Sequence, residues 1–244
     1  MFPEKIWMQE QEYRTMTPAV AKAYFAWFKE NIANEMESLQ AGMLIDPIAK
    51  KISLDYTPES LIPLYEWFLS VKKYKKLSEE QIREDYALAP DFILQEMLGK
   101  PYAPTIGSTD LAVKLGIYLG EVFVRNDSDL YWDYVKKPKN DVAYNRPVIC
   151  GFRPPGMDKH PTYQDVLSGC MPTYSSSKHG EKDKNSFYER YQLWMDNKEL
   201  FYSPVFSPEL YKKIWHELMF GPNKAKDKSD FSPKAILQKM KDMP

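Results

Sequence analysis

The strongest constraint on this chain is a long apolar stripe that lies between Thr17-Pro18 and Gly42. Its apolar residues recur at spacings of three and four, the period of one helix face. Thr17-Pro18 suits a helix start, because Thr caps free backbone N–H groups and Pro at the first helical position loses no hydrogen bond. We expect one long helix that buries the stripe, Trp27 included, in the main core. The stripe comprises Val20, Tyr24, Trp27, Phe28, Ile32, Met36 and Leu39.

A second Thr-Pro pair, Thr57-Pro58, precedes another apolar segment that reaches Leu69. The same capping argument predicts a second helix there. Four lysines follow within residues 72–76. We expect them in the last turn of that helix, where cations are favoured by the helix dipole. A solvated basic face is the favoured interpretation, and a phosphate site is the alternative.

Ser78 and Gln81 have the spacing of a capping box, in which each side chain accepts a hydrogen bond from the other residue's backbone N–H. A third helix is therefore predicted to start there and to stop before Pro90. Residues 91–98 are predicted to form a further short helix.

The helical period resumes from Leu111 to Phe123, after a predicted capping segment at residues 107–110. Gly116 and Gly120 lie one turn apart in this helix. Each costs about 1 kcal/mol of helix propensity relative to Ala, and together they remove side chains from one face. We therefore expect another element to pack closely against that face.

After Asp129 the apolar period changes from 3.6 to 2, which predicts a strand over residues 130–135. A turn-prone segment leads to a second run rich in strand formers, residues 144–152. A β-hairpin is the expected result. Pro147 cannot donate a ladder hydrogen bond, so we expect it on an edge or at the first position of a strand.

The remaining chain is predicted to be mainly helical, with helices at residues 161–167, 187–195 and 208–220. Residues 173–185 form a polar loop without an apolar period, and residues 178–185 are predicted to be mobile. The last segment is rich in lysine and carries one loose helix at residues 233–240.

These elements predict an α+β fold, mostly α-helical, with one small antiparallel β-hairpin or sheet at about residues 130–152. A chain of 244 residues suits a single core. We expect one globular domain over residues 1–221, helical over residues 1–105 and built from a helix, the hairpin and further helices over residues 106–221. A polar, Lys-rich C-terminal tail is expected over residues 222–244.

Composition restricts the partners and the compartment. The formal charge of −1 provides no field that would gather nucleic acid, so no nucleic-acid partner is expected. The first twelve residues contain charges and no apolar signal region, and the most apolar stretch, residues 115–124, contains Glu121. We expect no membrane association and a cytoplasmic location. Cys150 and Cys170 are interpreted as buried thiols, because a chain of this size needs no disulfide.

Motifs of known chemistry are missing from the sequence. His160, His179 and His216 lie in separate segments without a metal-ligand spacing, so neither a metal nor a cofactor is expected. The GxGxxG, GxxxxGK[ST] and GxSxG patterns do not occur. The residues from Ser175 to Lys178 could be taken for a Ser/Lys nucleophile pair, but a polar loop lacks the rigid support that a nucleophile needs.

Glu121 is the most informative anomaly, because it interrupts an apolar helix face and a buried carboxylate needs a partner. Arg125 at i+4 is one candidate, and Arg146 or Asn145 from the hairpin could add hydrogen bonds. Two interpretations stay open: a structural clamp between helix and hairpin, or an acid or base tuned for catalysis. The candidate polar cluster is Glu121, Arg125, Asn145, Arg146 and Trp132.

The same residues carry a family resemblance. Residues 118–125 read YLGEVFVR, and they are followed by a tryptophan at Trp132, by NRPV at residues 145–148 and by Gly151-Phe152. This block resembles the central part of an uncharacterised family of cytoplasmic proteins from Gram-positive bacteria. The resemblance implies a bacterial cytosolic origin. It assigns no activity and no catalytic residue.

Two functional hypotheses follow. The first is a non-enzymatic binding or interaction protein of the bacterial cytoplasm, of immunity or accessory type, whose partner is another protein. The second is a hydrolase-like enzyme with Glu121, Arg125 and Arg146 lining a pocket between the central helix and the hairpin. A buried and fully paired Glu121 favours the first, and a concave, water-accessible site around it favours the second. The sequence does not fix the oligomeric state.

Overall fold

The computed structural model describes residues 10–87, 91–157, 162–169, 184–221, 224–225 and 227–243. The described chain is mostly helical with two small antiparallel sheets, which confirms the predicted α+β class. In chain order the elements are α1 (Glu10–Thr15), α2 (Pro18–Leu44), η1 (Ala49–Lys51), η2 (Pro58–Ser60), α3 (Leu61–Val71), β1 (Tyr74–Lys76), α4 (Glu79–Asp85), α5 (Asp91–Gly99), β2 (Tyr102–Pro104), α6 (Ile106–Asn126), β3 (Tyr131–Tyr134), β4 (Pro147–Cys150), β5 (Tyr163–Gln164), α7 (Val166–Gly169), α8 (Ser186–Tyr202), α9 (Pro208–Phe220), η4 (Lys228–Phe231) and α10 (Pro233–Lys241).

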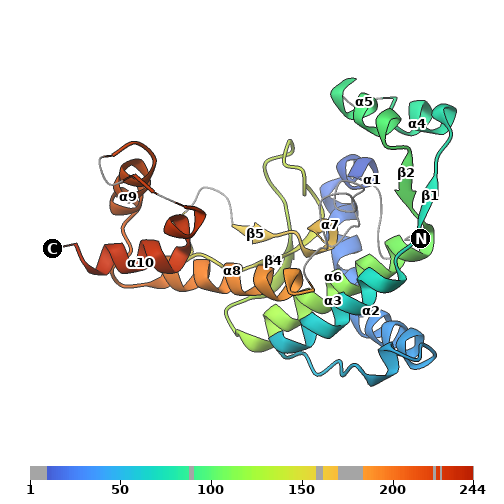
Figure 1. Cartoon of the computed structure of the whole chain (residues 1–244), viewed down its shortest axis with the longest axis horizontal. Coiled ribbons are helices and arrows are strands. Elements are labelled where there is room, and N and C mark those ends of the chain that lie inside the picture. Colours follow the sequence, from blue (N-terminus) through green and yellow to red (C-terminus); the bar gives the residue numbers. More distant parts are fainter. Residues whose placement is uncertain are drawn as a thin grey trace.

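Helix α6 lies at the centre of the main core (Figure 1). Helices α2, α3, α7 and α8 pack around it together with strands β3 and β4. All its residues from Leu115 to Gly120 are buried, because neighbours cover every side of the helix. A helix that is apolar all round is the sequence pattern that such a central position requires.

The glycine face of α6 is in close contact with two elements, as its sequence predicts. A Cβ atom on Gly116 would lie 2.7 Å from the carbonyl oxygen of Val166 in α7. A Cβ atom on Gly120 would lie 2.2 Å from Cζ2 of the Trp132 indole, which comes from β3. Both distances are far shorter than van der Waals contact, so only glycine lets α7 and β3 approach this helix.

The predicted hairpin is confirmed as the antiparallel pair β3–β4, with Trp132 opposite Ile149. Pro147 is the first residue of β4, one of its two expected positions. A third strand, β5, pairs with the other side of β4, so that β4 is central in this sheet. Gly151 follows β4 with φ +104°, and a Cβ atom there would lie 2.2 Å from the carbonyl oxygen of Asp129. The chain can turn out of the sheet at this point only with glycine.

Helix α2 begins as predicted, since the Thr17 side chain accepts a hydrogen bond from the backbone N–H of Val20. The helix continues past Gly42 to Leu44. Of the predicted stripe, Tyr24, Phe28, Met36 and Leu39 are buried. Trp27 is only half-buried and packs against the edge of the main core, and Val20 is exposed.

The basic run over residues 72–76 is not the last turn of a helix. Helix α3 ends at Val71, the Lys72 backbone is extended, and the next residues form β1, which pairs with β2. This pairing joins residues about thirty apart in sequence, and local propensity cannot reveal it. The capping box of Ser78 and Gln81 is confirmed at the start of α4.

Three further elements differ from the predictions. Helix α6 is capped by Thr105, whose side chain accepts from the N–H of Ser108, so it begins before the expected capping segment. The helix expected at residues 161–167 is replaced by β5 and the short α7, because these residues pair with β4 and pack on α6. Helix α8 continues to Tyr202, seven residues beyond the expected end at Met195.

The C-terminal residues form a second, smaller core. Helix α9 has the predicted bounds, and α10 packs against α8 and α9. The segment after residue 221, expected as a polar tail with one loose helix, thus includes an apolar helix face that is buried. Residues 178–183 of the segment expected to be mobile lie outside the described chain. This core, called the C-terminal core below, contains Leu200, Ile214, Leu218, Ile236, Leu237 and Met240.

Replacing Gly120 by alanine is expected to destabilise the fold by about 1–3 kcal/mol or more, because the new methyl group would displace the Trp132 ring. Gly42→Ala is the matched control: Gly42 is also helical, and a Cβ atom there would meet nothing within 4 Å. Gly42→Ala should instead stabilise the fold by up to about 1 kcal/mol, because alanine has the higher helix propensity. Urea unfolding of both variants measures the difference, and equal effects would contradict the close packing on α6.

Candidate functional site

Glu121 lies on α6 one residue after Gly120 and points along the side of the helix that Trp132 covers. Its Oε1 atom accepts a hydrogen bond of 2.9 Å from the indole Nε1 of Trp132. The Glu121 side chain is only 12% exposed. Because Gly120 has no side chain, the Trp132 indole can lie across the helix, and its N–H then supplies part of the hydrogen bonding that the mostly buried carboxylate requires.

Arg125 supplies the second partner of Glu121 from the next turn of α6. Its Nε donates to Oε2 of Glu121 at 3.1 Å, the i,i+4 arrangement in which Glu precedes the cation. The guanidinium carbon lies 3.6 Å from the centroid of the Tyr56 ring, in a cation–π contact. Both carboxylate oxygens of Glu121 therefore have a donor, and Arg125 is held between Glu121 and Tyr56.

Asn145, predicted for the same cluster, is buried and bonded to the N-terminal part of the chain. Its side-chain amide donates to the carbonyl oxygen of Tyr13 at 2.9 Å and to that of Met16 at 3.4 Å. Its φ of 65° places it in the left-handed region, which Asn tolerates better than most residues. Asn145 thus joins the hairpin to α1 and to the segment that connects α1 to α2.

Arg146 forms a third, different contact. Its Nη1 lies 3.2 Å from Oδ2 of Asp165, and both side chains are mostly buried. Its guanidinium carbon also lies 5.5 Å from the centroid of the Tyr13 ring. Of the five predicted residues, the structure brings Glu121, Arg125 and Trp132 together, while Asn145 and Arg146 bond to other partners.

Glu121 has the paired geometry that the clamp interpretation requires, because each of its two carboxylate oxygens accepts a hydrogen bond. Three surface pockets of the described chain are lined by other residues, from α8, from the loop after α6 and from the β1–α4 junction. Within the described residues there is also no group of three His, Cys, Asp or Glu side chains that could hold a metal ion. The carboxylate of Glu121 joins α6 to β3 through Trp132 and holds Arg125 within α6.

Cys150 is buried in the sheet, as the sequence interpretation has it. Burial, followed by the nearby Asp133 carboxylate, raises the pKa of its thiol to about 12. The reactive thiolate form is therefore suppressed at neutral pH. Cys170 lies outside the described residues, as do His160 and His179, whereas His216 lies exposed on α9 against Phe220.

Sequence reasoning missed a second ionic cluster, centred on Lys198 of α8. The Lys198 Nζ atom lies 2.7 Å from both carboxylate oxygens of Asp127 and 2.8 Å from Oδ2 of Asp129. Burial alone would lower the pKa of Lys198, but the hydrogen bonds and charges of the two carboxylates raise it. The cluster ties α8 to the loop after α6. The charges of Asp127 and Asp129 were visible in the sequence, but their partner lies about seventy residues away.

Sequence reasoning also missed an exposed apolar turn at the end of α2. Leu44, Ile45 and Ile48 are 63%, 87% and 63% exposed, and we call these three residues the α2 ridge. The only sequence signal was a run of apolar residues at a helix end, and such a run is equally typical of residues that are buried in a core.

Neither the models of known protein families, nor curated proteins, nor solved structures match this chain. Among the described helices, none combines the length and the apolar character needed to span a bilayer. Function is therefore inferred from the residues of this chain.

Removing the Glu121 carboxylate is expected to cost about 1–3 kcal/mol in Glu121→Ala, because the half-buried Trp132 N–H loses its acceptor. Glu121→Gln should cost less, since its amide oxygen can still accept that bond. Trp132→Phe removes the donor instead. In a double-mutant cycle of Glu121→Ala and Trp132→Phe, a coupling of about 0.5 kcal/mol or more is expected, and strict additivity would contradict the clamp.

Lys198→Met is expected to destabilise the fold by about 1–3 kcal/mol, because it leaves the mostly buried Asp127 carboxylate without its cation. Lys234→Met is the control, since Lys234 pairs with Asp196 but is 69% exposed and should contribute less than about 1 kcal/mol. The raised pKa means that the Lys198 contribution is complete below the unfolded value of about 10.4 and is lost only at higher pH. Urea unfolding at neutral pH compares the two variants.

Proposed function

We propose that this chain is a non-enzymatic binding protein of the bacterial cytoplasm, of immunity or accessory type, and that the α2 ridge docks another protein. The observation that supports this proposal is the exposure of Leu44, Ile45 and Ile48 within five residues of chain. Single exposed apolar residues are common on protein surfaces. Three together at one projecting turn are instead typical of an interface.

The turn that carries the ridge is held by hydrogen bonds and by buried residues on both sides. Oδ1 of Asp46 accepts hydrogen bonds from the backbone N–H groups of Ile48 at 2.8 Å and Ala49 at 3.0 Å. Met43 and Ala49, on either side of the ridge, are buried and anchor the turn to the main core. A partner would therefore bind side chains whose backbone is already ordered, which reduces the entropy lost on association.

Basic residues border the ridge. Lys50 and Lys51 follow in η1, and both are exposed. An apolar centre beside a charged rim is the usual composition of a protein interface. The lysines favour a partner that carries carboxylates around an apolar groove, because complementary charge increases the association rate and selects the partner.

The pairing of Glu121 supports a binding protein over the hydrolase alternative. Both of its oxygens accept hydrogen bonds from Trp132 and Arg125, and the arginine is in turn stacked on Tyr56. A general acid or base needs an oxygen that can reach the substrate. Freeing one oxygen here would break either the bond that joins α6 to β3 or the bond to Arg125 within α6.

The function is tested by affinity purification of the tagged chain from lysate of its native cells, comparing wild type with Ile45→Asp. We expect a protein partner that binds wild type and is lost with Ile45→Asp. Phe220→Asp on α9 is the matched control, since Phe220 is equally apolar and 74% exposed. Equal recovery of every bound protein with Ile45→Asp and with wild type would contradict docking at the ridge.

The ridge turn is expected to weaken in acid, because backbone hydrogen bonds from Ala49 and Ile48 lower the pKa of Asp46. Its contribution is present above the unfolded value of about 3.9 and is lost as pH falls through the lower folded value. The melting temperature of wild type should exceed that of Asp46→Ala at about pH 6 and approach it at about pH 2. Asp46→Asn keeps the acceptor oxygen without a charge, so its advantage over Asp46→Ala should not change with pH.

A further inference from the structure

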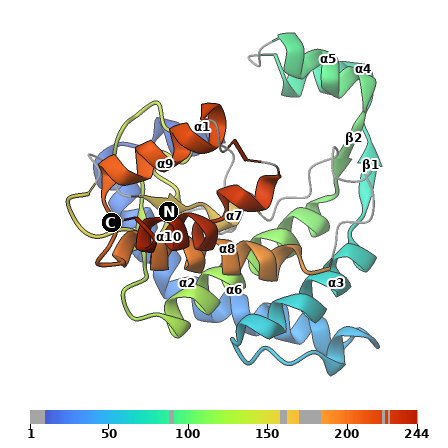
Figure 2. The same cartoon turned by 60° about the vertical axis from the view of Figure 1, so that its left-hand side comes forward.

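Residues 72–87 and 91–104 form an arm that projects from the body of the protein (Figures 1 and 2). Its base is a stalk, residues 72–76 and 100–104, in which β1 pairs with β2. Its end is a tip, residues 79–87 and 91–99, in which α4 packs against α5. In both views the arm rises on the side of the molecule away from the end of α2.

The stalk and the tip carry opposite charges. The stalk contains five lysines and no acidic residue. The tip contains six acidic residues and one basic residue, Arg83. Each copy of the chain therefore presents a strongly basic and a strongly acidic surface on the same arm.

These charges are mostly not neutralised within the arm. Arg83–Glu79 and Lys100–Glu96 form ion pairs within the arm, each between residues one helical turn apart. Among the described residues, no opposite charge lies within ion-pair distance of the stalk residues Lys75 and Lys76 or of the tip residues Glu84 and Asp85. All four side chains are exposed.

The arm also combines an exposed aromatic side chain with a pocket. Phe92, in the first turn of α5, is 70% exposed. A surface pocket of about 430 Å³ lies where the stalk meets the tip, and its apolar lining includes Leu77, Ile82, Leu98 and Pro101. This volume is within the range of about 300–1,000 Å³ that binding pockets usually have. Phe92 lies at the start of α5 and Leu98 near its end, so one arm cannot place its own Phe92 in its own pocket.

We propose that the arms of two copies of this chain pair antiparallel and form a two-fold symmetric dimer. The acidic tip of each arm lies on the basic stalk of the other, and each Phe92 enters the pocket of the other copy. A two-fold axis requires a surface that is complementary to itself. An arm with opposite charges at its two ends, and with an aromatic knob and a pocket, meets this requirement. A different protein would need only one of the two charged surfaces.

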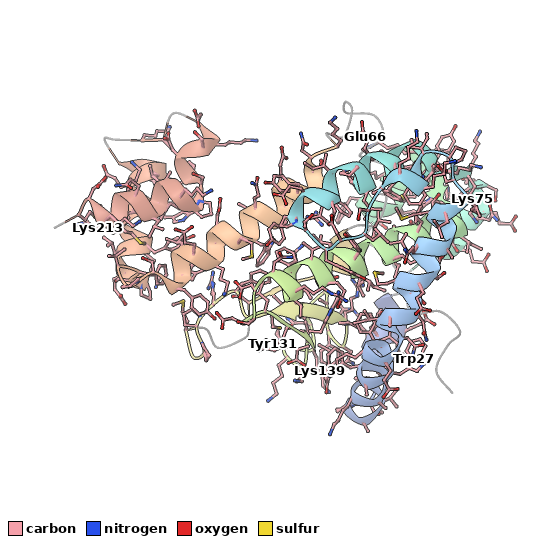
Figure 3. All side chains as sticks on the ribbon, turned by 90° about the horizontal axis from the view of Figure 1, so that it is seen from below. Trp27, Glu66, Lys75, Tyr131, Lys139 and Lys213 are labelled. Carbon is pink, nitrogen blue, oxygen red and sulfur yellow. The ribbon has the colours of Figure 1, made fainter. Side chains whose placement is uncertain are left out.

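The size and position of the arm suit this pairing. Specific interfaces use about 20–30 residues from each partner, and the arm offers a similar number. Figure 3 shows Lys75 of the stalk and Lys213 of α9 at opposite ends of the molecule, so the C-terminal core lies far from the paired arms. The α2 ridge also stays open, because it lies on another side of the body.

Sedimentation equilibrium of the full chain tests the proposal directly. We expect a dimer at micromolar concentration in low salt. Raising the salt to about 1 M should weaken dimerisation tenfold or more, because exposed charges are screened at that concentration. A chain that stays monomeric up to about 100 μM in low salt would overturn the proposal, since a specific interface of this size binds more tightly.

A charge swap distinguishes pairing of arms from any other dimer. Glu84→Lys/Asp85→Lys reverses part of the tip, at the end of α4 where cations suit the helix dipole. Lys75→Glu/Lys76→Glu reverses part of the stalk. Each variant alone should dimerise at least tenfold more weakly than wild type. Mixing the two restores both tip–stalk contacts in a heterodimer, so the mixture should dimerise nearly as wild type does. Homodimers of undiminished affinity, or a mixture without recovery, would overturn the proposal.

Phe92→Ala tests the knob. It should weaken dimerisation about tenfold or more without lowering the melting temperature of the monomer, since the side chain is mostly exposed. Phe220→Ala, at a similarly exposed position on α9, should leave dimerisation unchanged. Equal dimer affinities of the two variants would contradict insertion of Phe92.

Discussion

The contact of the Trp132 indole with the bare backbone at Gly120 is the constraint on which the centre of the structure depends. The ring lies on α6 because no Cβ atom intervenes, its N–H bonds to Glu121, and its centroid lies 5.1 Å from that of Phe28 in α2. One side chain of β3 thereby joins the sheet, the central helix and the first long helix. The order of Gly120 before Glu121 produces both the space and the acceptor, so the packing and the polar pairing at this point are inseparable.

The sequence predicted what depends on near neighbours. The cap at Thr17, the capping box at Ser78 and the change of period after Asp129 each involve a few adjacent residues, and the structure has all three features. The glycine pair on α6 predicted that something approaches closely, but only the fold could identify the indole of Trp132 and the backbone of Val166. Strand β1 was not predicted, because four lysines around one tyrosine do not have the residue pattern of a strand. These residues are a strand because they pair with β2, which lies almost thirty residues later in the chain.

In the candidate site, too, the sequence predicted the contacts between near neighbours and not those between distant segments. Arg125 follows from helix geometry, since i and i+4 share a face. Asn145 and Arg146 are adjacent in sequence and were expected to reach Glu121 together, but the left-handed backbone at Asn145 directs its amide to α1, and Arg146 bonds to Asp165. The salt bridges of Lys198 depend on which elements pack against each other in the fold. The exposure of Ile45 depends on the absence of any element packed over it. No pattern within one segment contains that information.

Helix α8 belongs to both cores of the protein. Phe187 and Tyr191 near its start are buried in the main core, and Leu200 near its end is buried in the C-terminal core. The two cores are therefore joined by a continuous helix and not by a hinge. At 1.5 Å per residue the helix is about 25 Å long, so a tilt of only about 5° at its start moves its end by about 2 Å. A small repacking of side chains around Phe187 would therefore move α9 and α10 by a larger distance than it moves the start of α8.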